Sequence, residues 1–174
     1  PIRLGQTHGF NTDCLPLDDR RRNFLTERYT GGGDRVALLR DGIVGFGGSF
    51  VIIPSVEEDM ERLISRGQLW GPNSKMLRGA PSKFHSNSVM AWEANQDKLF
   101  LATGYALSWD GVWRQHSWCV NPRPRSIQII ETTEARMLYF GHVMTLEETV
   151  MFADYNTDFG VEVEPETYAR YGLE

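Results

Sequence analysis

The spacing of hydrophobic and polar positions divides the start of the chain into an arm and a β-rich stretch. Residues 1–34 carry little periodicity apart from a polar stretch at residues 18–28, which we expect to be a helix within an N-terminal arm. Residues 36–53 are β-rich, and Asp41-Gly42 lies there between two apolar runs. That dipeptide is a hairpin signal, so we expect two paired strands.

A helix is expected to follow this stretch. Ser55 and Glu58 have the spacing of a capping box, an apolar stripe follows them, and Gly67 is a stop signal. Residues 67–83 are rich in Gly, Pro, Ser and Asn, which predicts a connecting loop.

The rest of the chain alternates helix-like and strand-like patterns. A helix is expected near residues 86–92, and strands are expected at residues 98–108, 112–120 and 127–132. Asp110-Gly111 and residues 121–125 are the predicted turns between those strands. Thr145 and Glu148 form a second capping box that opens a helix through Phe152, and the polar tail has room for one more helix.

Length and composition indicate a single domain, residues 1–174, and the order of helix-like and strand-like segments predicts the α+β class, with helices packed on an antiparallel β-sheet. A chain of this length buries roughly 70% of its unfolded surface. Hydrophobic residues make up 41% of the chain and charged residues 24%, which is an ordinary globular balance. The chain is therefore expected to fold without a metal or disulfide framework.

Charge and cysteine content restrict the partners and the compartment. The net charge of -5 argues against general binding to nucleic acid or to an anionic membrane. No apolar run is long enough to span a membrane, and the N-terminus lacks a secretory pattern. Because the chain has only 2 cysteines, a reducing, cytoplasmic location is expected. The sequence does not predict an oligomeric state.

The strongest chemical signal comes from two neighbouring predicted strands. If the hairpin centre lies between Arg123 and Pro124, then His116 and Glu131 are directly opposed, with Cβ atoms about 5 Å apart. A carboxylate at that distance fixes which ring nitrogen of the imidazole carries the proton, as in a base with its orienting acid. Two other interpretations stay open. The groups satisfy each other as a buried polar pair, or the register is off by one residue and one side chain faces solvent.

A second signal is the polar cluster Phe84-His85-Ser86-Asn87-Ser88 at the expected start of a helix. Unpaired backbone N–H groups at a helix N-terminus favour anions and developing oxyanions. The alternative is simple N-capping by Ser or Asn.

Five segments carry a resemblance to a known family. They are Phe84-His85-Ser86-Asn87-Ser88, Gly104-Tyr105-Ala106-Leu107-Ser108, Trp113-Arg114-Gln115-His116-Ser117-Trp118, Glu131-Thr132-Thr133 and Tyr139-Phe140-Gly141. In this order they resemble a family of small, mostly uncharacterised bacterial and phage proteins, which is similar in turn to papain-type cysteine hydrolases of the cell-wall-amidase or transglutaminase-like kind. The resemblance implies a papain-like core over residues 84–153. It also implies a nucleophilic cysteine that opens a helix, with His116 as the base and Glu131 as the orienting acid.

The nucleophile position departs from that pattern, because Phe84 stands where the helix-opening cysteine is expected. Phenylalanine cannot attack a carbonyl. Ser86 and Ser88 are close in sequence, and a serine with a histidine base is a sound nucleophile. We take Ser86 as the candidate catalytic serine.

The remaining reactive residues offer weaker candidates. Cys14 would have to come from the N-terminal arm, and Cys119 lies on the strand face opposite His116. The histidines have no compact metal-ligand spacing, so we predict neither a metal nor a cofactor. They are His8, His85, His116 and His142.

Aromatic and polar residues near the predicted site are candidates for binding a substrate. Trp118 is expected in the core, whereas Trp113 is either buried under a helix or exposed at a binding surface. The residues expected to contact a substrate are Phe84, His85, Asn87 and Trp113. Asn87 or the helix-terminal N–H groups would lie near an oxyanion.

Two functions of different classes follow. The first is a papain-like hydrolase or acyl-transfer enzyme that acts on an amide, ester or thioester of a small molecule or peptide, with His116 as base and Glu131 as orienting acid. The second is a non-catalytic member of the same fold that binds a peptide, a small molecule or a protein partner. Phe84 favours the second function, whereas the His116 and Glu131 pair favours the first, because a buried charged pair is costly to keep.

Overall fold

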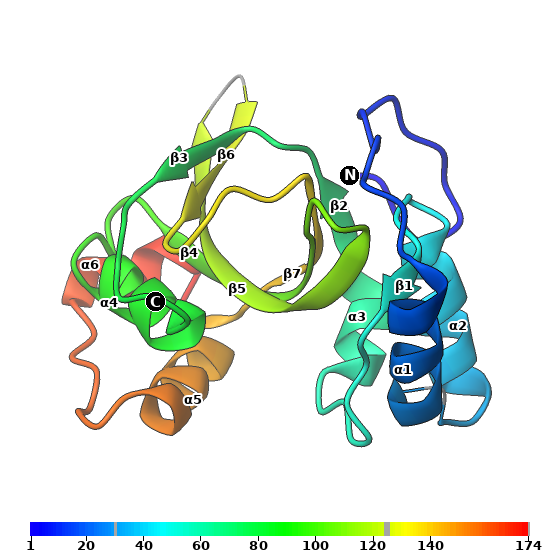
Figure 1. The fold of residues 1–174 in the computed structure, drawn as a ribbon. Helices are drawn as coiled ribbons and strands as arrows, with labels where there is room; N and C mark the ends of the chain where they lie inside the picture. The colour runs from blue at the N-terminus through cyan, green and yellow to red at the C-terminus, as the bar shows by residue number, and fades with distance from the viewer. Residues whose placement is uncertain (30, 124–125, 174) are drawn as a thin grey trace. The chain divides into compact units, whose positions relative to one another are not determined.

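The computed structural model describes residues 1–29, 31–123 and 126–173, and it confirms the α+β class with a mostly antiparallel sheet (Figure 1). The strand order is β2-β7-β4-β5-β6-β3, and β1 pairs with β5. Contacts divide the chain into two compact units. Unit 1 comprises Pro1–Pro72, Gly104–Gln115 and Arg136–His142, and unit 2 comprises Asn73–Thr103, His116–Ala135 and Val143–Glu174.

Unit 1 combines helices and short strands with parts of three longer strands. Its elements are α1 (Asp19–Tyr29), α2 (Asp34–Val44), β1 (Phe50–Val51), α3 (Met60–Arg66), β2 (Gln68–Trp70), the later part of β4 (Phe100–Leu107), the first part of β5 (Val112–Arg123) and most of β7 (Leu138–Val143). β1 runs parallel to β5, and β2 runs antiparallel to β7. The core of the unit includes Leu39, Ile43, Phe46, Tyr105, Trp113 and Phe140.

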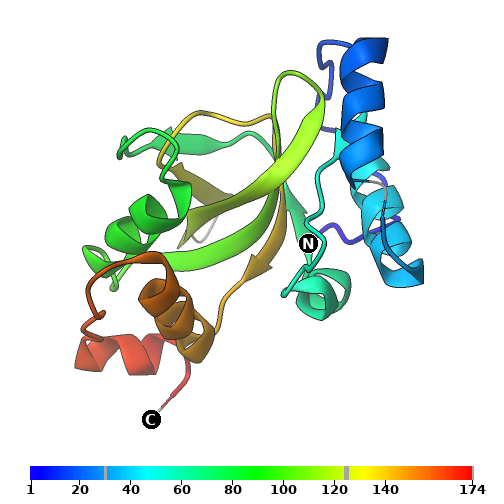
Figure 2. The same ribbon diagram turned by 60° about the horizontal axis from the view of Figure 1, so that its bottom comes forward.

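Unit 2 contains the other parts of β4 and β5, together with the elements that carry the candidate site. These are β3 (Ser74–Met76), α4 (Phe84–Glu93), β6 (Ser126–Glu131), α5 (Leu146–Asn156) and α6 (Pro165–Arg170). β6 pairs antiparallel with β5 and parallel with β3. Helices α4 and α5 lie side by side (Figure 2). The apolar core of the unit includes Val89, Trp92, Leu101, Cys119, Ile130 and Ala153.

The elements predicted from the middle of the chain onward are largely confirmed. Helix α4 and strands β4, β5 and β6 are present with shifts of a few residues at their ends. The capping box of α5 is complete, because Thr145 Oγ1 accepts from Glu148 N at 3.2 Å and Glu148 Oε2 accepts from Thr145 N at 2.9 Å. Helices α1 and α6 occupy the two polar stretches expected to be helical.

The hairpin predicted within residues 36–53 is wrong, because Asp34–Val44 forms helix α2. Leu39 and Ile43, which are four residues apart, are fully buried, whereas 50% of Leu38 is exposed. That spacing of buried positions is helical, and Asp41-Gly42 lies within the helix rather than at a turn. Only the two residues of β1 are a strand in this stretch.

Other boundaries also differ from the sequence prediction. Helix α3 begins at Met60 after the N-cap Asp59, which makes no side-chain cap, so the predicted capping box at Ser55 is wrong, although the helix does end at Gly67. The predicted loop at residues 67–83 contains β2 and β3, and β7 was not predicted. Strands of three residues carry no readable period, and β7 is buried on both faces, so it does not alternate.

Part of the turn predicted at residues 121–125 belongs to a strand instead. β5 continues to Arg123 and β6 begins at Ser126. Pro124 and Arg125 lie outside the described residues.

Candidate functional site

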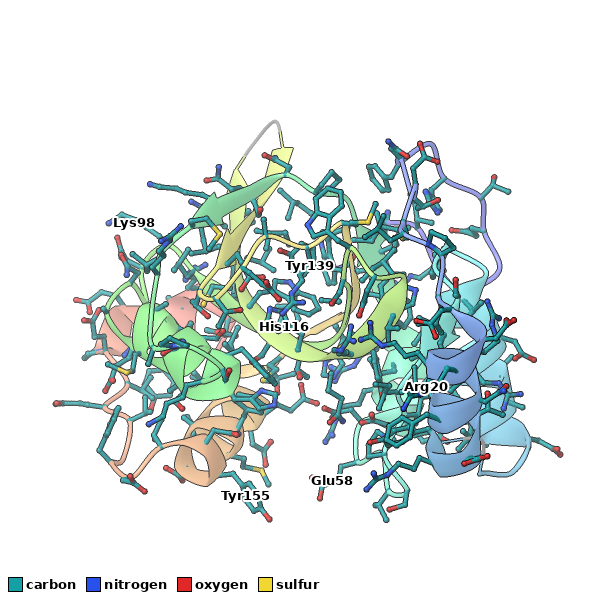
Figure 3. The ribbon with its side chains drawn as sticks, in the orientation of Figure 1. Arg20, Glu58, Lys98, His116, Tyr139 and Tyr155 are labelled. Carbon is teal, nitrogen blue, oxygen red and sulfur yellow. The ribbon has the colours of Figure 1, made fainter. Side chains whose placement is uncertain are left out.

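His116, which is labelled in Figure 3, forms a buried pair with Glu131 in unit 2, and this pair is the centre of the candidate site. Nε2 of His116 lies 2.9 Å from Oε2 and 3.2 Å from Oε1 of Glu131. The exposed fraction is 2% for His116 and 0% for Glu131. The predicted hydrogen bond between them is therefore confirmed. Because an ionised carboxylate can only accept, Nε2 carries the proton of this bond.

The register that brings the pair together differs by two residues from the predicted one. Val120 is paired with Ile129, whereas the prediction paired it with Ile127. His116 and Glu131 are therefore diagonal neighbours, so the predicted direct opposition is wrong. A shift of two residues leaves every side chain on its predicted face, and long side chains still meet across a diagonal.

The other side of the Glu131 carboxylate is held by the turn that follows β6. Oε1 accepts from Thr132 N at 2.8 Å, from Thr133 N at 2.9 Å and from Thr133 Oγ1 at 3.0 Å. Oε2 makes the shorter contact with His116. Three donors and an imidazole together replace the water that the buried carboxyl group has lost.

The first residue of α4 lies against this pair. The ring of Phe84 is half-buried, and its centroid lies 5.0 Å from that of the His116 imidazole. Lys83 is the N-cap of the helix, and no side chain caps its N-terminus. The predicted start of a helix beside the sheet is thus confirmed, whereas N-capping by Ser or Asn is not found.

His85 adds a second imidazole to the site. Its ring lies 4.4 Å from that of Phe84 and 5.2 Å from that of Phe152 on α5, by their centroids. Its Nδ1 lies 2.8 Å from Oγ of the buried Ser117. Burial, and then the neighbouring His116, lower the pKa of His85 to about 4. The His85 ring is therefore neutral at pH 7.

The polar residues of α4 have local roles. Asn87 Oδ1 accepts from Ala80 N at 3.0 Å and Nδ2 donates to Ala80 O at 2.7 Å, so its amide fastens the preceding loop. Ser88 Oγ donates to Ser117 O at 3.0 Å. Ser86 is half-buried and follows Phe84 by two positions, about 200° around the helix. Ser86 therefore does not share the helix face that Phe84 presents to the imidazole.

Neither cysteine has the surroundings of a reactive thiol. Cys119 is fully buried in unit 2, and its Sγ donates to Ser88 O at 3.2 Å. Burial, together with Glu131, raises the pKa of Cys119. In unit 1, burial and then two aspartates raise the pKa of Cys14, whose Sγ lies 3.4 Å from Met137 Sδ. A raised pKa keeps a thiol protonated and poorly nucleophilic.

The two tryptophans considered in the sequence analysis, Trp113 and Trp118, are both buried. Trp113 is fully buried in unit 1 and donates from Nε1 to Gly47 O at 2.8 Å, which settles the question of its exposure. Trp118 is in the core of unit 2, stacked beside His116. Across the described ranges, no group of three or more His, Cys, Asp or Glu side chains is arranged to hold a metal ion.

Sequence reasoning missed two residues that shape the site, Ser117 and Thr133. Alternation along β5 places the Ser117 side chain on the face opposite His116, and on that face its Oγ contacts Nδ1 of His85. Thr133 has a local signal, since residues just after a carboxylate commonly donate to it in a turn.

Comparison with models of known families gives no match for this chain, and neither the curated proteins nor the solved structures contain a significant match.

In the described part of the chain, none of the helices has the length and apolar composition to cross a membrane.

Replacing Glu131 with glutamine tests how strongly the buried pair stabilises the fold. An amide cannot accept from all of the groups that now donate to the carboxylate, so Glu131→Gln should lower the free energy of unfolding by about 2 kcal/mol. Urea denaturation measures the change. Thr133→Val, which removes a single donor, should have a smaller effect. A Glu131→Gln protein as stable as the wild type would contradict the stabilising role of the pair.

Stability at acid pH should depend on His85. Its pKa of about 4 in the folded protein is below the ordinary 6.5, so the unfolded chain takes up a proton first as the pH falls. The stabilisation is complete above about pH 6.5 and is lost between there and about pH 4. His85→Gln should therefore lose less stability than the wild type over this range. Urea denaturation at several pH values measures the slopes, and equal slopes would contradict the prediction.

Proposed function

We propose that the chain has a papain-like core that binds a peptide or small molecule without hydrolysing it through a thiol. The observation that carries the proposal is the contact of Phe84, the first residue of α4, with the imidazole of His116, at 5.0 Å between ring centroids. His116 in turn bonds Glu131 on the next strand. Helix start, strand imidazole and acid on the next strand are the three positions of a papain-type nucleophile, base and orienting acid.

Phe84 directs this arrangement towards binding. Its side chain cannot attack a carbonyl, and its half-buried ring lies against an imidazole that is only 2% exposed. The groups left for a ligand are the half-buried rings of Phe84, His85 and Phe152. Ring faces favour an apolar or aromatic group. Backbone N–H groups in the first turn of α4 favour a carbonyl or carboxylate oxygen next to it.

A second candidate function is hydrolysis or acyl transfer with Ser86 as the nucleophile. The observation that favours it is the complete set of partners around the buried His116 and Glu131 pair. Removing two ionisable groups from water is costly, and a base with its orienting acid is one reason to retain them. The position of Ser86 on the helix, away from the Phe84 face, weighs against this candidate.

A cysteine placed at position 84 tests the papain-like arrangement. A thiol at a helix N-terminus and beside an imidazole has a lowered pKa, so more of it is thiolate at neutral pH. Phe84→Cys should be alkylated by iodoacetamide at pH 7 at least about tenfold faster than an ordinary exposed thiol. Peptide mass spectrometry at successive times measures the rate at each cysteine. The wild-type thiols, Cys14 and Cys119, should react slowly.

Two matched variants separate the contribution of the imidazole from that of the helix. Ser86→Cys places a thiol in the same first turn but on a different face, and it should react more slowly than Phe84→Cys. Adding His116→Ala to Phe84→Cys should bring the rate down to that of Ser86→Cys. Equal rates for the two cysteine variants would contradict the proposed arrangement. Rapid labelling of the wild type, abolished by Cys14→Ser, would identify Cys14 as the attacking group instead.

The serine alternative has its own measurement. A fluorophosphonate probe forms a covalent bond with a serine that a histidine activates. We expect no labelling of the wild-type protein at Ser86. Labelling that is lost in both Ser86→Ala and His116→Ala would establish the hydrolase and overturn the binding proposal.

A further inference from the structure

Strand β3 is at one end of the strand order and is paired only on one side within the described residues. Ile129 N donates to Asn73 O at 3.0 Å, and Leu77 N donates to Glu131 O at 2.8 Å. In a parallel ladder, alternate residues of one strand make the bonds to its neighbour. The residues between them, Ser74 and Met76, therefore direct their backbone N–H and C=O groups away from β6.

The segment that contains β3 has charged side chains of one sign. Lys75, Arg78 and Lys83 are exposed, and no Asp or Glu occurs from residue 73 to residue 92. The whole chain has 23 acidic and 18 basic residues, so this segment reverses the overall balance. Within the described part of the chain, none of these three basic side chains is engaged in an ion pair.

We propose that β3 takes up an extended acidic peptide as an added strand. The backbone groups of Ser74 and Met76 pair with alternate residues of the peptide, which is the usual mode of strand addition to a free sheet edge. Lys75, Arg78 and Lys83 attract its carboxylates. A lysine on a short edge strand discourages the addition of other strands, and a peptide carboxylate opposite it would neutralise the charge that does so. The inference does not rest on the proposed function of the rings of Phe84, His85 and Phe152, which we call the Phe84 site.

The probe is an acetylated, amidated hexapeptide of alternating glutamate and valine, titrated into the whole protein. Glutamate supplies charge on one face of the strand and valine supplies β-propensity on the other. Backbone amide NMR should show saturable shifts that are largest at Ser74 and Met76. The same peptide with lysine in place of glutamate should not bind. A single-stranded oligonucleotide of similar charge should not reproduce these shifts, because it has no strand-forming backbone.

Two changes remove the backbone pairing while leaving the charges in place. Met76→Pro eliminates an N–H that points away from β6, a position where an edge strand tolerates proline, and it should weaken binding at least about fivefold. Met76→Leu is the control and should bind like the wild type. N-methylation of alternate amides in the peptide tests the same bonds on the unmodified protein and should also abolish binding.

The remaining experiments reverse the charges beside β3 and test whether the peptide binds at the Phe84 site instead. Lys75→Glu combined with Arg78→Glu should weaken binding about tenfold or more, and added salt should weaken wild-type binding. In the wild-type protein, the backbone amide signal of Phe152 should not shift with the peptide. The inference is overturned if the glutamate peptide does not bind, if the N-methylated or lysine peptide binds equally well, or if the largest shifts are at His85 and Phe152 rather than at Ser74 and Met76. The last result would assign the peptide to the Phe84 site instead.

Discussion

The hydrogen bond between His116 and Glu131 is the constraint on which the rest of unit 2 depends. A carboxylate with no exposed surface is tolerated only when its lone pairs are filled, because the loss of hydration costs several kcal/mol in a protein interior. Filling them requires β5 and β6 to stay in one register. It also requires the turn after β6 to point Thr132 N, Thr133 N and Thr133 Oγ1 at the same oxygen. The polar pair therefore fixes the geometry of two strands and a turn.

The sequence predicted the partners of this bond but not their exact pairing, and the reason is physical. Alternation determines the face of a strand on which a side chain lies, and a slip of two residues does not change it. The register depends on where the hairpin reverses, and two prolines, Pro122 and Pro124, leave that point open in the sequence. A slip of one residue would have separated His116 from Glu131. The sequence therefore predicts the contact between His116 and Glu131 even though the predicted register differs by two residues from the one in the structure.

In other parts of the chain, the sequence prediction is wrong because a local signal competes with tertiary packing. Asp41-Gly42 is a strong turn signal, yet Leu39 and Ile43 bury one face of a helix in the core of unit 1, and that burial decides the outcome. The strands β2 and β3 form by pairing with segments far away in the chain, so no local pattern marks them. Helix α5 was predicted correctly because Thr145 and Glu148 satisfy its end with local bonds.

Phe84 links the constraint on the pair to the proposed function. Its ring lies against the His116 imidazole, which is 2% exposed. The contact between the His116 imidazole and Glu131 is thus a buried hydrogen bond. The Phe84 ring is half-buried, and it continues through His85 to Phe152 as a row of rings in edge-to-face contact. Under the proposed function, substitution of a nucleophile by an aromatic ring thus both removes the chemistry and supplies the binding surface.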